Sequence, residues 1–295
     1  MSFITIGIEI GLLYAPLALG IYLALRVLSL PDLTLEGSFG IGGAATAGLL
    51  AHGSDPLVSL LGGMAAGACA GLVTAMLHLR LRMNVLLAGI LMTTAAWSIS
   101  LIIMGSGNVP LLTEATLFSW AQDAGLSLDA ATLAVGGSAT ALVAVALAWF
   151  LHTDYGLSMR ASGLSIQTAR GFGVRTEARQ VVGLMLANAL AAASGGLVVQ
   201  SQGFMDVSIQ VGVIVVGLAA LMIGQAVIRS PRPIPAIAGV LIGVVVYRMI
   251  VAWTIQQGMN PNYVRLVTAL VVVVVIAART QSHGLVALPG TARAR

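Results

Sequence analysis

Residues 152–179 of this 295-residue chain read His152-TDYGLSMRASGLSIQTARGFGVRTEA-Arg179, and they form the one sizeable polar segment of an otherwise apolar sequence. The segment carries four guanidinium groups, at Arg160, Arg170, Arg175 and Arg179. Charged side chains are costly inside the hydrocarbon layer of a membrane. The segment is therefore expected to lie on one side of a membrane between two spans, and it sets the topology of the rest of the chain.

Inside this segment, Leu164 to Phe172 is expected to form about two helical turns. Leu164, Thr168 and Phe172 are spaced four residues apart and so share one face, while Arg170 lies elsewhere on the helix. Gly163 before this segment and Gly171 and Gly173 at its other end are expected to mark the two ends of the helix. Two interpretations fit this pattern equally: a short helix that presses into a groove on a soluble partner, or a solvated loop without a partner.

The composition places the chain among polytopic, all-α membrane proteins. Hydrophobic residues make up 58% of it and charged residues only 8%, with a mean hydropathy of +1.00. The net charge of +4 does not indicate nucleic-acid binding, because the arginines are scattered between apolar runs rather than gathered on a polar face. The positions of the arginines between apolar runs indicate membrane topology instead.

All 14 basic residues are arginine. A chain without lysine cannot supply the lysine of a P-loop or of a Schiff base, so any ATP hydrolysis is expected to belong to another polypeptide. The single cysteine, Cys69, excludes an intrachain disulfide. The four histidines lie far apart near the ends of apolar runs, and no paired metal-ligand spacing or nucleophile motif occurs. We therefore expect no catalytic site, no metal and no cofactor in this chain.

Nine apolar stretches are predicted to be transmembrane helices, most of them close to the roughly 20 residues that cross a bilayer. They cover residues 4–25, 38–51, 57–77, 85–105, 131–151, 180–199, 207–228, 236–255 and 263–278. The second stretch is short, and hydropathy does not decide whether it crosses fully, tilts, or folds back as a re-entrant hairpin.

Charge predicts the orientation. If the segment 152–179 is cytoplasmic and all nine stretches cross, the N-terminus lies outside and the C-terminus inside. The arginines that then fall on the cytoplasmic side are Arg26, Arg80, Arg82, Arg160, Arg170, Arg175, Arg179, Arg229, Arg232, Arg279, Arg293 and Arg295. The acids that fall on the other side are Asp55, Glu114, Asp123, Asp129 and Asp206.

The sequence thus divides into a transmembrane domain over residues 1–279 and a short basic cytoplasmic tail over residues 280–295. Within the domain, residues 152–179 form the cytoplasmic segment, and residues 106–130 form the longest external loop. That loop carries three acids and no base, so it either receives an extracellular partner or is simply solvated, with Trp120 at the interface.

Two polar features lie close to apolar stretches. Between the first and second stretches, Leu30-PDLTLEG-Ser38 contains a helix-ending proline and the capping residues Asp32 and Thr34. It is either a broken helix facing a solute path or an ordinary capped cytoplasmic turn. Arg248 lies deep in the eighth stretch, where it needs a partner, and Glu9 and Asp206 are the candidate counter-ions.

Several segments, in order, resemble permeases of bacterial ATP-binding cassette (ABC) importers of the branched-chain amino acid and ribose type. The segments are Asp32-LTLEG-Ser38 with Gly42-Gly43-Ala44, then Arg82-MNVLLAGI-Leu91, then Gly156-LSMR-Ala161 through Ala169-RGFG-Val174, then Ser194-Gly195-Gly196 with Val215-VGLAALMI-Gly224. The resemblance covers nearly the whole chain. Within the family, the sequence around Pro31 is most similar to that of a compact subgroup associated with binding proteins for aromatic and other amino acids.

The resemblance implies a permease subunit in the bacterial cytoplasmic (inner) membrane, working by alternating access. Its implied partners are a cytoplasmic ATPase dimer that holds ATP and Mg²⁺, a second permease copy, and an extracytoplasmic solute-binding protein. The residues predicted to couple the permease to the ATPase are Ser158, Arg160, Leu164, Arg170 and Phe172. The residues predicted for the solute path are Asp32, Thr34, Glu36 and Asn84.

A secondary transporter or channel that needs no ATPase is the alternative function. It requires a relay of ionisable groups inside the membrane, for which Arg248 alone is thin support. The class of solute and the choice between a homodimer and a heterodimer stay open at this point.

Overall fold

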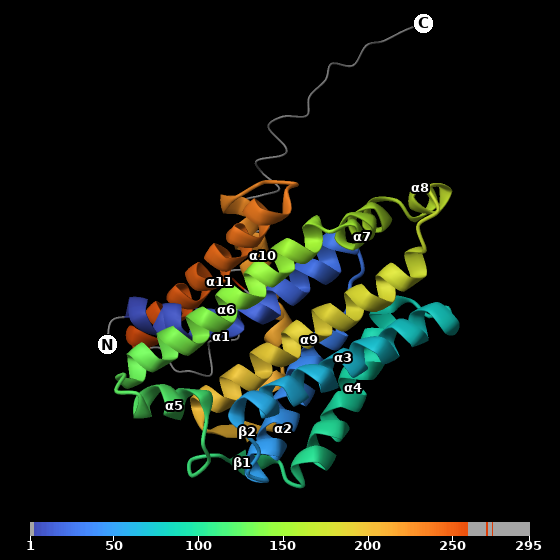
Figure 1. The fold of residues 1–295 in the computed structure, drawn as a ribbon. Helices are drawn as coiled ribbons and strands as arrows, with labels where there is room; N and C mark the ends of the chain where they lie inside the picture. The colour runs from blue at the N-terminus through green and yellow to red at the C-terminus, as the bar shows by residue number, and fades with distance from the viewer. Residues whose placement is uncertain (1–2, 259–269, 271–272, 274–295) are drawn as a thin grey trace, which may run out of the picture.

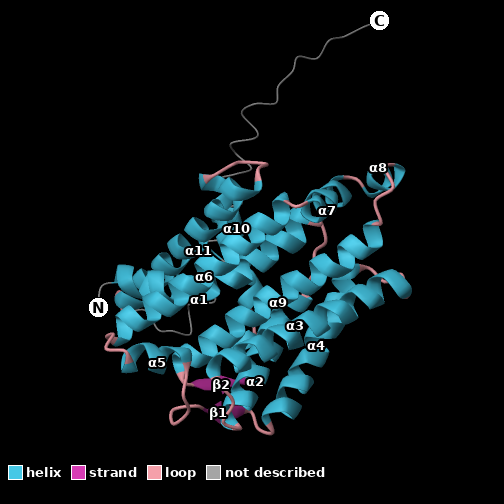
Figure 2. Cartoon of the chain, viewed as in Figure 1, coloured by secondary structure: helices cyan, strands magenta, loops and turns pink. Residues whose placement is uncertain are grey.

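A computed structural model describes residues 3–258 together with Leu270 and Val273. The chain folds into a bundle of long, roughly aligned helices with small elements at both ends (Figures 1 and 2). The long helices are α1 (Phe3–Tyr22, continued by the π-helix η1, Leu23–Val27), α2 (Thr34–Ala51), α3 (Pro56–Arg80), α4 (Val85–Met104), α6 (Leu128–His152), α9 (Thr176–Gln202), α10 (Val213–Val227) and α11 (Pro233–Gln256). The short elements are β1 (Asn108–Pro110), α5 (Leu117–Asp123), α7 (Asp154–Leu164), α8 (Ile166–Gly171), β2 (Phe204–Asp206) and the 3₁₀-helix η2 (Val207–Gln210).

Seven spans in the described part of the chain are long and apolar enough to cross a membrane. They correspond to seven of the nine predicted stretches, with ends that differ by at most four residues. The ninth stretch, 263–278, and the predicted tail lie outside the described residues, apart from Leu270 and Val273. The chain is therefore a multi-pass membrane protein.

The second predicted stretch, α2, is a single helix of 18 residues, about 27 Å long. It does not reach the hydropathy of the seven spans, because glycine, threonine and serine replace bulky apolar residues along it. Thirteen of its residues are buried, and it packs against α3, α4 and α9. A helix enclosed by protein meets little lipid, so it does not need a lipophilic surface.

Small residues let α2, α3 and α9 approach closely, as the glycine pattern of the sequence predicts. A Cβ atom added at Gly42 would overlap Ala192, and one at Gly195 would overlap the carbonyl oxygen of Phe39. On α3, a Cβ atom at Gly71 would lie 2.5 Å from the carbonyl oxygen of Leu184. These contacts join the three helices into one tightly packed unit.

The stretch predicted as one helix over 207–228 is broken in the structure. The 3₁₀-helix η2 ends at Gln210, and α10 begins only at Val213. Gly212, between them, has φ +82°, in the left-handed region that favours glycine. The irregular backbone is tolerated at this position because neighbouring side chains provide hydrogen-bond partners.

The predicted external loop 106–130 is more ordered than a solvated loop. Its strand β1 pairs antiparallel with β2, so the fold contains a small sheet that the all-α prediction lacked (Figure 2). The buried side chain of Phe118 anchors α5, and the amide of Leu117 donates to Gln200 on α9. At the edge of this sheet, Ser208 donates its hydroxyl and its backbone N–H to Asp206, which lowers the pKa of that carboxyl. Packing and pairing therefore tie the loop to the bundle.

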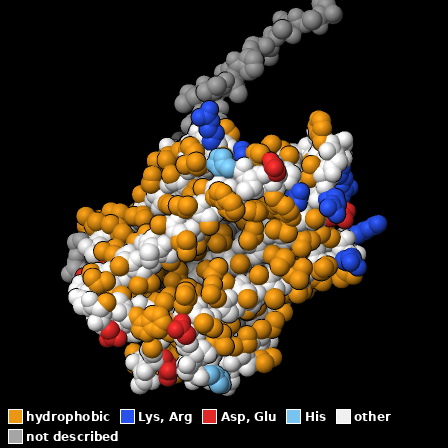
Figure 3. Space-filling view, viewed as in Figure 1, with side chains coloured by type: hydrophobic (Ala, Val, Ile, Leu, Met, Phe, Trp, Pro, Cys, Tyr) orange, Lys and Arg blue, Asp and Glu red, His pale blue; other side chains and the backbone are white. Residues whose placement is uncertain are grey.

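Charged residues separate to the two ends of the bundle. Basic side chains gather at the end that carries α7 and α8, and an apolar belt covers the middle of the visible face (Figure 3). Arg26, Arg160 and Arg229 line one cavity at that end. The opposite end holds β1, β2 and α5, and acidic side chains are visible there in Figure 3. This arrangement agrees with the predicted grouping of charges.

The close contact of α2 with α9 gives a test of the packing. We expect Gly195→Ala to destabilise the protein by about 1–3 kcal/mol, because the added methyl group meets backbone and cannot be accommodated by a rotamer change. Thermal unfolding in detergent micelles measures this effect. Gly137→Ala on α6 is the matched control, since the nearest atom to its added Cβ is 3.9 Å away, on Leu12. Equal melting temperatures for the two variants would contradict the proposed packing.

Candidate coupling surface and central polar cluster

The predicted helix Leu164–Phe172 is not continuous, and the prediction was wrong in this respect. Helix α7 ends at Leu164, and α8 runs only from Ile166 to Gly171. Ser165, between them, is extended, with φ −159° and ψ 108°, and its hydroxyl accepts a hydrogen bond from the amide of Thr168. Serine is a favoured N-cap residue because it satisfies a free amide of the first helical turn. The segment is therefore two helices joined at a capped break.

Two large apolar side chains stand out from this pair of helices. Leu164 is 89% exposed at the end of α7, and Phe172 is 84% exposed directly after α8. Their exposure at the arginine-rich end makes them candidates for contact with another protein. We call Leu164, Phe172 and the two helices α7 and α8 the coupling surface.

The other residues predicted for coupling lie on the same helices and hold them in place. Ser158 donates its hydroxyl to the carbonyl of Tyr155, one turn earlier in α7. Arg160 donates to the carbonyl of Pro231, in the connection between α10 and α11. The structure thus places Arg160 against a second part of the chain.

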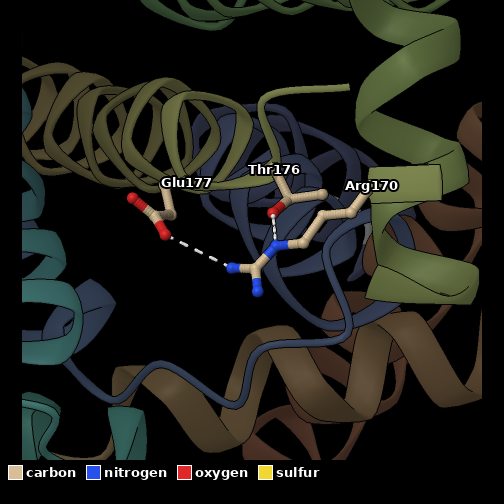
Figure 4. Close-up of polar contacts among 3 residues, drawn as sticks. All are labelled: Arg170, Thr176 and Glu177. Atoms are coloured by element: carbon tan, nitrogen blue, oxygen red, sulfur yellow. Dashed lines mark hydrogen bonds and ion pairs between the residues drawn. The ribbon is translucent and has the colours of Figure 1, made fainter. Parts of the chain in front are cut away.

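Arg170 ties α8 to the start of α9 (Figure 4). Its Nε donates to Thr176 Oγ1 over 3.0 Å, and its Nη2 pairs with Glu177 Oε1 at 3.3 Å. Both side chains of the ion pair are more than half exposed, so water screens the attraction. The contribution of Arg170 is geometric, since it fixes the angle at which α8 meets α9.

A second pair of contacts ties α7 to the same helix. Tyr155 donates its hydroxyl to the carbonyl of Ala178, and the guanidinium carbon of Arg179 lies 3.6 Å from the centre of the Tyr155 ring. A cation stacked on an aromatic face contributes about 0.5–1 kcal/mol at exposed sites. Both halves of the coupling surface are therefore attached to the first turn of α9.

On its other side, α7 packs against the end of α1. A Cβ atom at Gly163 would overlap the carbonyl oxygen of Val27, the last residue of the π-helix η1. The absence of a side chain at Gly163 lets the two backbones touch. The coupling surface thus contacts both α1 and α9, two of the most buried helices of the bundle.

A cluster of polar side chains lies at the centre of the protein, around the first turn of α2. Asp32 is only 3% exposed, and its Oδ1 caps α2 by accepting from the amide of Thr34. Its Oδ2 accepts from Asn188 Nδ2 over 2.8 Å. Asn188 in turn accepts from the hydroxyl of Ser38 over 2.7 Å. We call Asp32, Asn188 and Ser38 the central cluster.

Threonine hydroxyl groups extend this cluster to α3 and α4. Thr34 shares a hydrogen bond of 2.7 Å with Thr74 on α3. Thr93 on α4 donates to the carbonyl of Leu33 over 2.7 Å. Four helices therefore meet at the start of α2 through polar contacts, and Asp32 and Thr34, both predicted for the solute path, take part in these internal bonds.

The other two residues predicted for the solute path lie elsewhere. Glu36 is partly exposed, and its Oε1 accepts from the amide of Gly212, at the break before α10. A carboxylate at a helix N-terminus is stabilised by the helix dipole. Asn84 is exposed and caps α4 by accepting from the amide of Leu86. The structure does not bring Asn84 together with the central cluster.

Arg248 does not pair with either of the proposed counter-ions. Its guanidinium carbon lies 3.7 Å from the centre of the Tyr14 ring, and Tyr14 stacks on Phe39 of α2. Asp206 binds Ser208 and Asn108 instead, and Glu9 Oε1 is buried without a hydrogen-bond partner. An aromatic face therefore takes the place of the predicted carboxylate.

Asn188 was missed by the prediction, although its sequence carries a signal. Apart from Gln180 at its first position, it is the one amide side chain of the predicted stretch 180–199. Such side chains in a membrane helix generally bond to a neighbouring helix. The sequence does not show which helix supplies the partner, and that information comes only from the fold.

These features define a class of protein: a multi-pass membrane protein with a polar, arginine-rich segment that exposes two large apolar side chains, and whose described residues include no cluster of three or more metal-ligating side chains. Residues 3–276 match the family described as "Branched-chain amino acid transport system / permease component". The chain therefore belongs to this family of ABC-type permeases. Family membership implies a separate ATPase and a solute-binding protein as partners.

Two relatives are similar over almost their full lengths. The "Tyrosine transport system permease protein" of Clostridioides difficile (strain R20291) is 30% identical over 267 residues, which cover 90% of this chain and 88% of the relative. An uncharacterized protein of Rickettsia prowazekii (strain Madrid E) is 28% identical over 275 residues, covering 92% and 95% respectively. No solved structure matches this chain.

The central cluster can be tested by a double-mutant cycle. We expect Asn188→Leu to destabilise the protein by about 2–3 kcal/mol, because the buried Asp32 carboxylate loses its donor. Adding Asp32→Leu to this variant should cost less than Asp32→Leu alone, since the two side chains share one interaction. Chemical unfolding in detergent gives the four values. Asn108→Ala is the control, because its bond to Asp206 is exposed. Strictly additive losses would show that the two side chains are not coupled.

Proposed function

We propose that the chain forms the solute pathway of an ABC importer and that the coupling surface docks on its ATPase subunits. The observation that carries this proposal is the exposure of Leu164 and Phe172 on two short helices that are fixed to α9. An apolar pair held out from the bundle by local hydrogen bonds fits a groove on a soluble protein. ATP and Mg²⁺ belong to that partner, and we expect no catalysis by this chain.

The contacts supply a route from the coupling surface to the bundle centre. Arg170 and Tyr155 attach α8 and α7 to the first turn of α9. Asn188, about 18 Å further along α9, binds Asp32 and Ser38 at the start of α2. A helix transmits a displacement along its axis because its backbone bonds are all internal. Movement of the ATPase would therefore shift α9 and α2 together and open or close the path.

We propose an amino acid as the solute. The support is the family description and the relative named as a tyrosine transport permease, and aromatic amino acids are the first to test. Asp32, Thr34, Glu36 and Asn84 stay the predicted residues of the path. Among them, Glu36 is partly exposed at the point where α2 meets the broken start of α10, which supports testing it first for contact with a polar solute.

The assembly and its orientation are also part of the proposal. We place α7, α8 and the arginine-rich end in the bacterial cytoplasm, with the N-terminus outside and the C-terminus inside, because basic residues concentrate on the cytoplasmic side of membrane proteins. The end with β1, β2 and α5 would then receive the solute-binding protein. A second copy of this chain would complete the path.

Cysteine labelling tests the orientation. Cys69 is replaced by alanine, and a single cysteine is then introduced in Leu164→Cys or Leu112→Cys, two highly exposed positions at opposite ends. In intact spheroplasts, a membrane-impermeant maleimide should label position 112 and not position 164, because only the former faces outward. Opening the membrane should expose position 164. Labelling of position 164 from outside would reverse the proposed orientation.

Coupling is tested with Phe172→Ala and Arg170→Glu in the reconstituted complex. Phe172 is 84% exposed, so its truncation should leave the fold intact while lowering solute-dependent stimulation of ATP hydrolysis about tenfold or more, as for a central side chain of an interface. Arg170→Glu should lower it too, because it repels Glu177 and reorients α8. Leu142→Ala, 72% exposed on the membrane-spanning helix α6, is the control. Normal stimulation in both variants would exclude this surface from coupling.

A further inference from the structure

A cavity of about 540 Å³ lies behind the coupling surface, at the arginine-rich end of the bundle. Three parts of the chain enclose it: the π-helix η1 at the end of α1, helix α7, and the connection between α10 and α11 with its flanking turns. Its residues are Tyr22, Arg26, Val27, Arg160, Leu164, Gln225, Ile228, Arg229, Ser230, Pro231, Ala236 and Val240.

The charge of this cavity is strongly one-sided. Each of the three enclosing parts contributes one guanidinium group, namely Arg26, Arg160 and Arg229. None of the described residues that line the cavity is acidic. Two contacts of these arginines go to neutral acceptors: Arg26 donates to Gln225, and Arg160 donates to the carbonyl of Pro231. Three positive charges around one space attract an anion that can accept several hydrogen bonds.

The placement of these arginines is built into the fold. Arg26 lies on the one π-helix of the described chain, and π-turns inside α-helices often occur at functional sites. The wider turn changes the direction of Arg26 relative to a continued α-helix. Gly163 then packs α7 against the last residue of the same π-helix, which brings Arg160 to the cavity.

The remaining walls are mainly apolar. Val27, Leu164, Ile228, Ala236 and Val240 line the cavity beside the arginines, and it opens at the end of a membrane-spanning bundle. A soluble anion such as inorganic phosphate gains nothing from apolar walls. An amphiphile with a phosphate group and hydrocarbon chains matches both kinds of surface.

We propose that this cavity binds the phosphate group of an anionic phospholipid. The three guanidinium groups hold the phosphate oxygens, and the acyl chains leave along the apolar walls toward the bilayer. The site goes beyond the solute pathway, and only its assignment to the cytoplasmic leaflet rests on the proposed orientation. A bound headgroup joins α7 to the α10–α11 connection, so it braces the coupling surface against the second half of the bundle.

Native mass spectrometry of the full-length permease in detergent tests this site, with dioleoylphosphatidylglycerol as the probe and dioleoylphosphatidylcholine as the reference. The unmodified protein should retain the anionic lipid preferentially. Arg160→Gln and Arg229→Gln should each reduce its retention about fivefold, the effect of one basic residue near a lipid surface. Arg232→Gln is the matched control, because Arg232 follows Arg229 by three residues in the same connection but does not line the cavity.

Three results would overturn the proposal. The first is equal retention of the two lipids by the unmodified protein. The second is an equal loss in Arg232→Gln, which would assign the effect to the general positive charge of this end. The third is displacement of the lipid by millimolar inorganic phosphate, which would assign the cavity to a free anion. The assay needs neither the ATPase nor a transported solute, so its failure is distinct from failure of the proposed function.

Discussion

The hydrogen bond between Asp32 and Asn188 is the interaction on which the rest of the bundle depends. A carboxylate that is 3% exposed within an apolar bundle is very unfavourable unless donors surround it. The amide of Thr34 and the side chain of Asn188 provide those donors, and they come from two different helices. The cluster therefore fixes where α2 begins and its position along the axis of α9. That position decides which glycines of α2 lie against α9.

The chemical character of α2 follows from the same constraint. Because α3, α4 and α9 enclose this helix, its surface contacts protein, and small residues such as Gly42 improve that contact. The lipid-facing helices show the opposite pattern, with large exposed apolar side chains such as Ile102 on α4 and Trp149 on α6. In a membrane, tight packing of small residues replaces the hydrophobic effect as the force between helices. A long helix that does not reach the hydropathy of the seven spans is thus largely buried, with thirteen of its 18 residues enclosed by protein.

Much of this fold could be predicted from the sequence, because length and hydropathy determine a membrane span almost directly. The helix that ends at Gln202 and the helix that starts at Pro233 agree with the predicted stretches within a few residues. The break at Ser165 could have been found from its capping pattern with Thr168. The pairing of Arg248 with Tyr14 could not, because hydropathy carries no information about which side chains meet across helices. The roles of the predicted site residues stay predictions, since contacts alone do not reveal a solute.

The arginines at one end of the bundle attach the short helices α7 and α8 to neighbouring parts of the chain. Arginine suits this end because its planar group keeps its charge and forms several directed hydrogen bonds at once. Arg170 uses them to attach α8 to α9, and Arg160 uses one to reach the α10–α11 connection. Arginines of the polar segment 152–179 therefore join α7 and α8 both to α9 and to the α10–α11 connection. A displacement of α7 and α8 would strain both attachments together, so the two halves would respond as one mechanical unit.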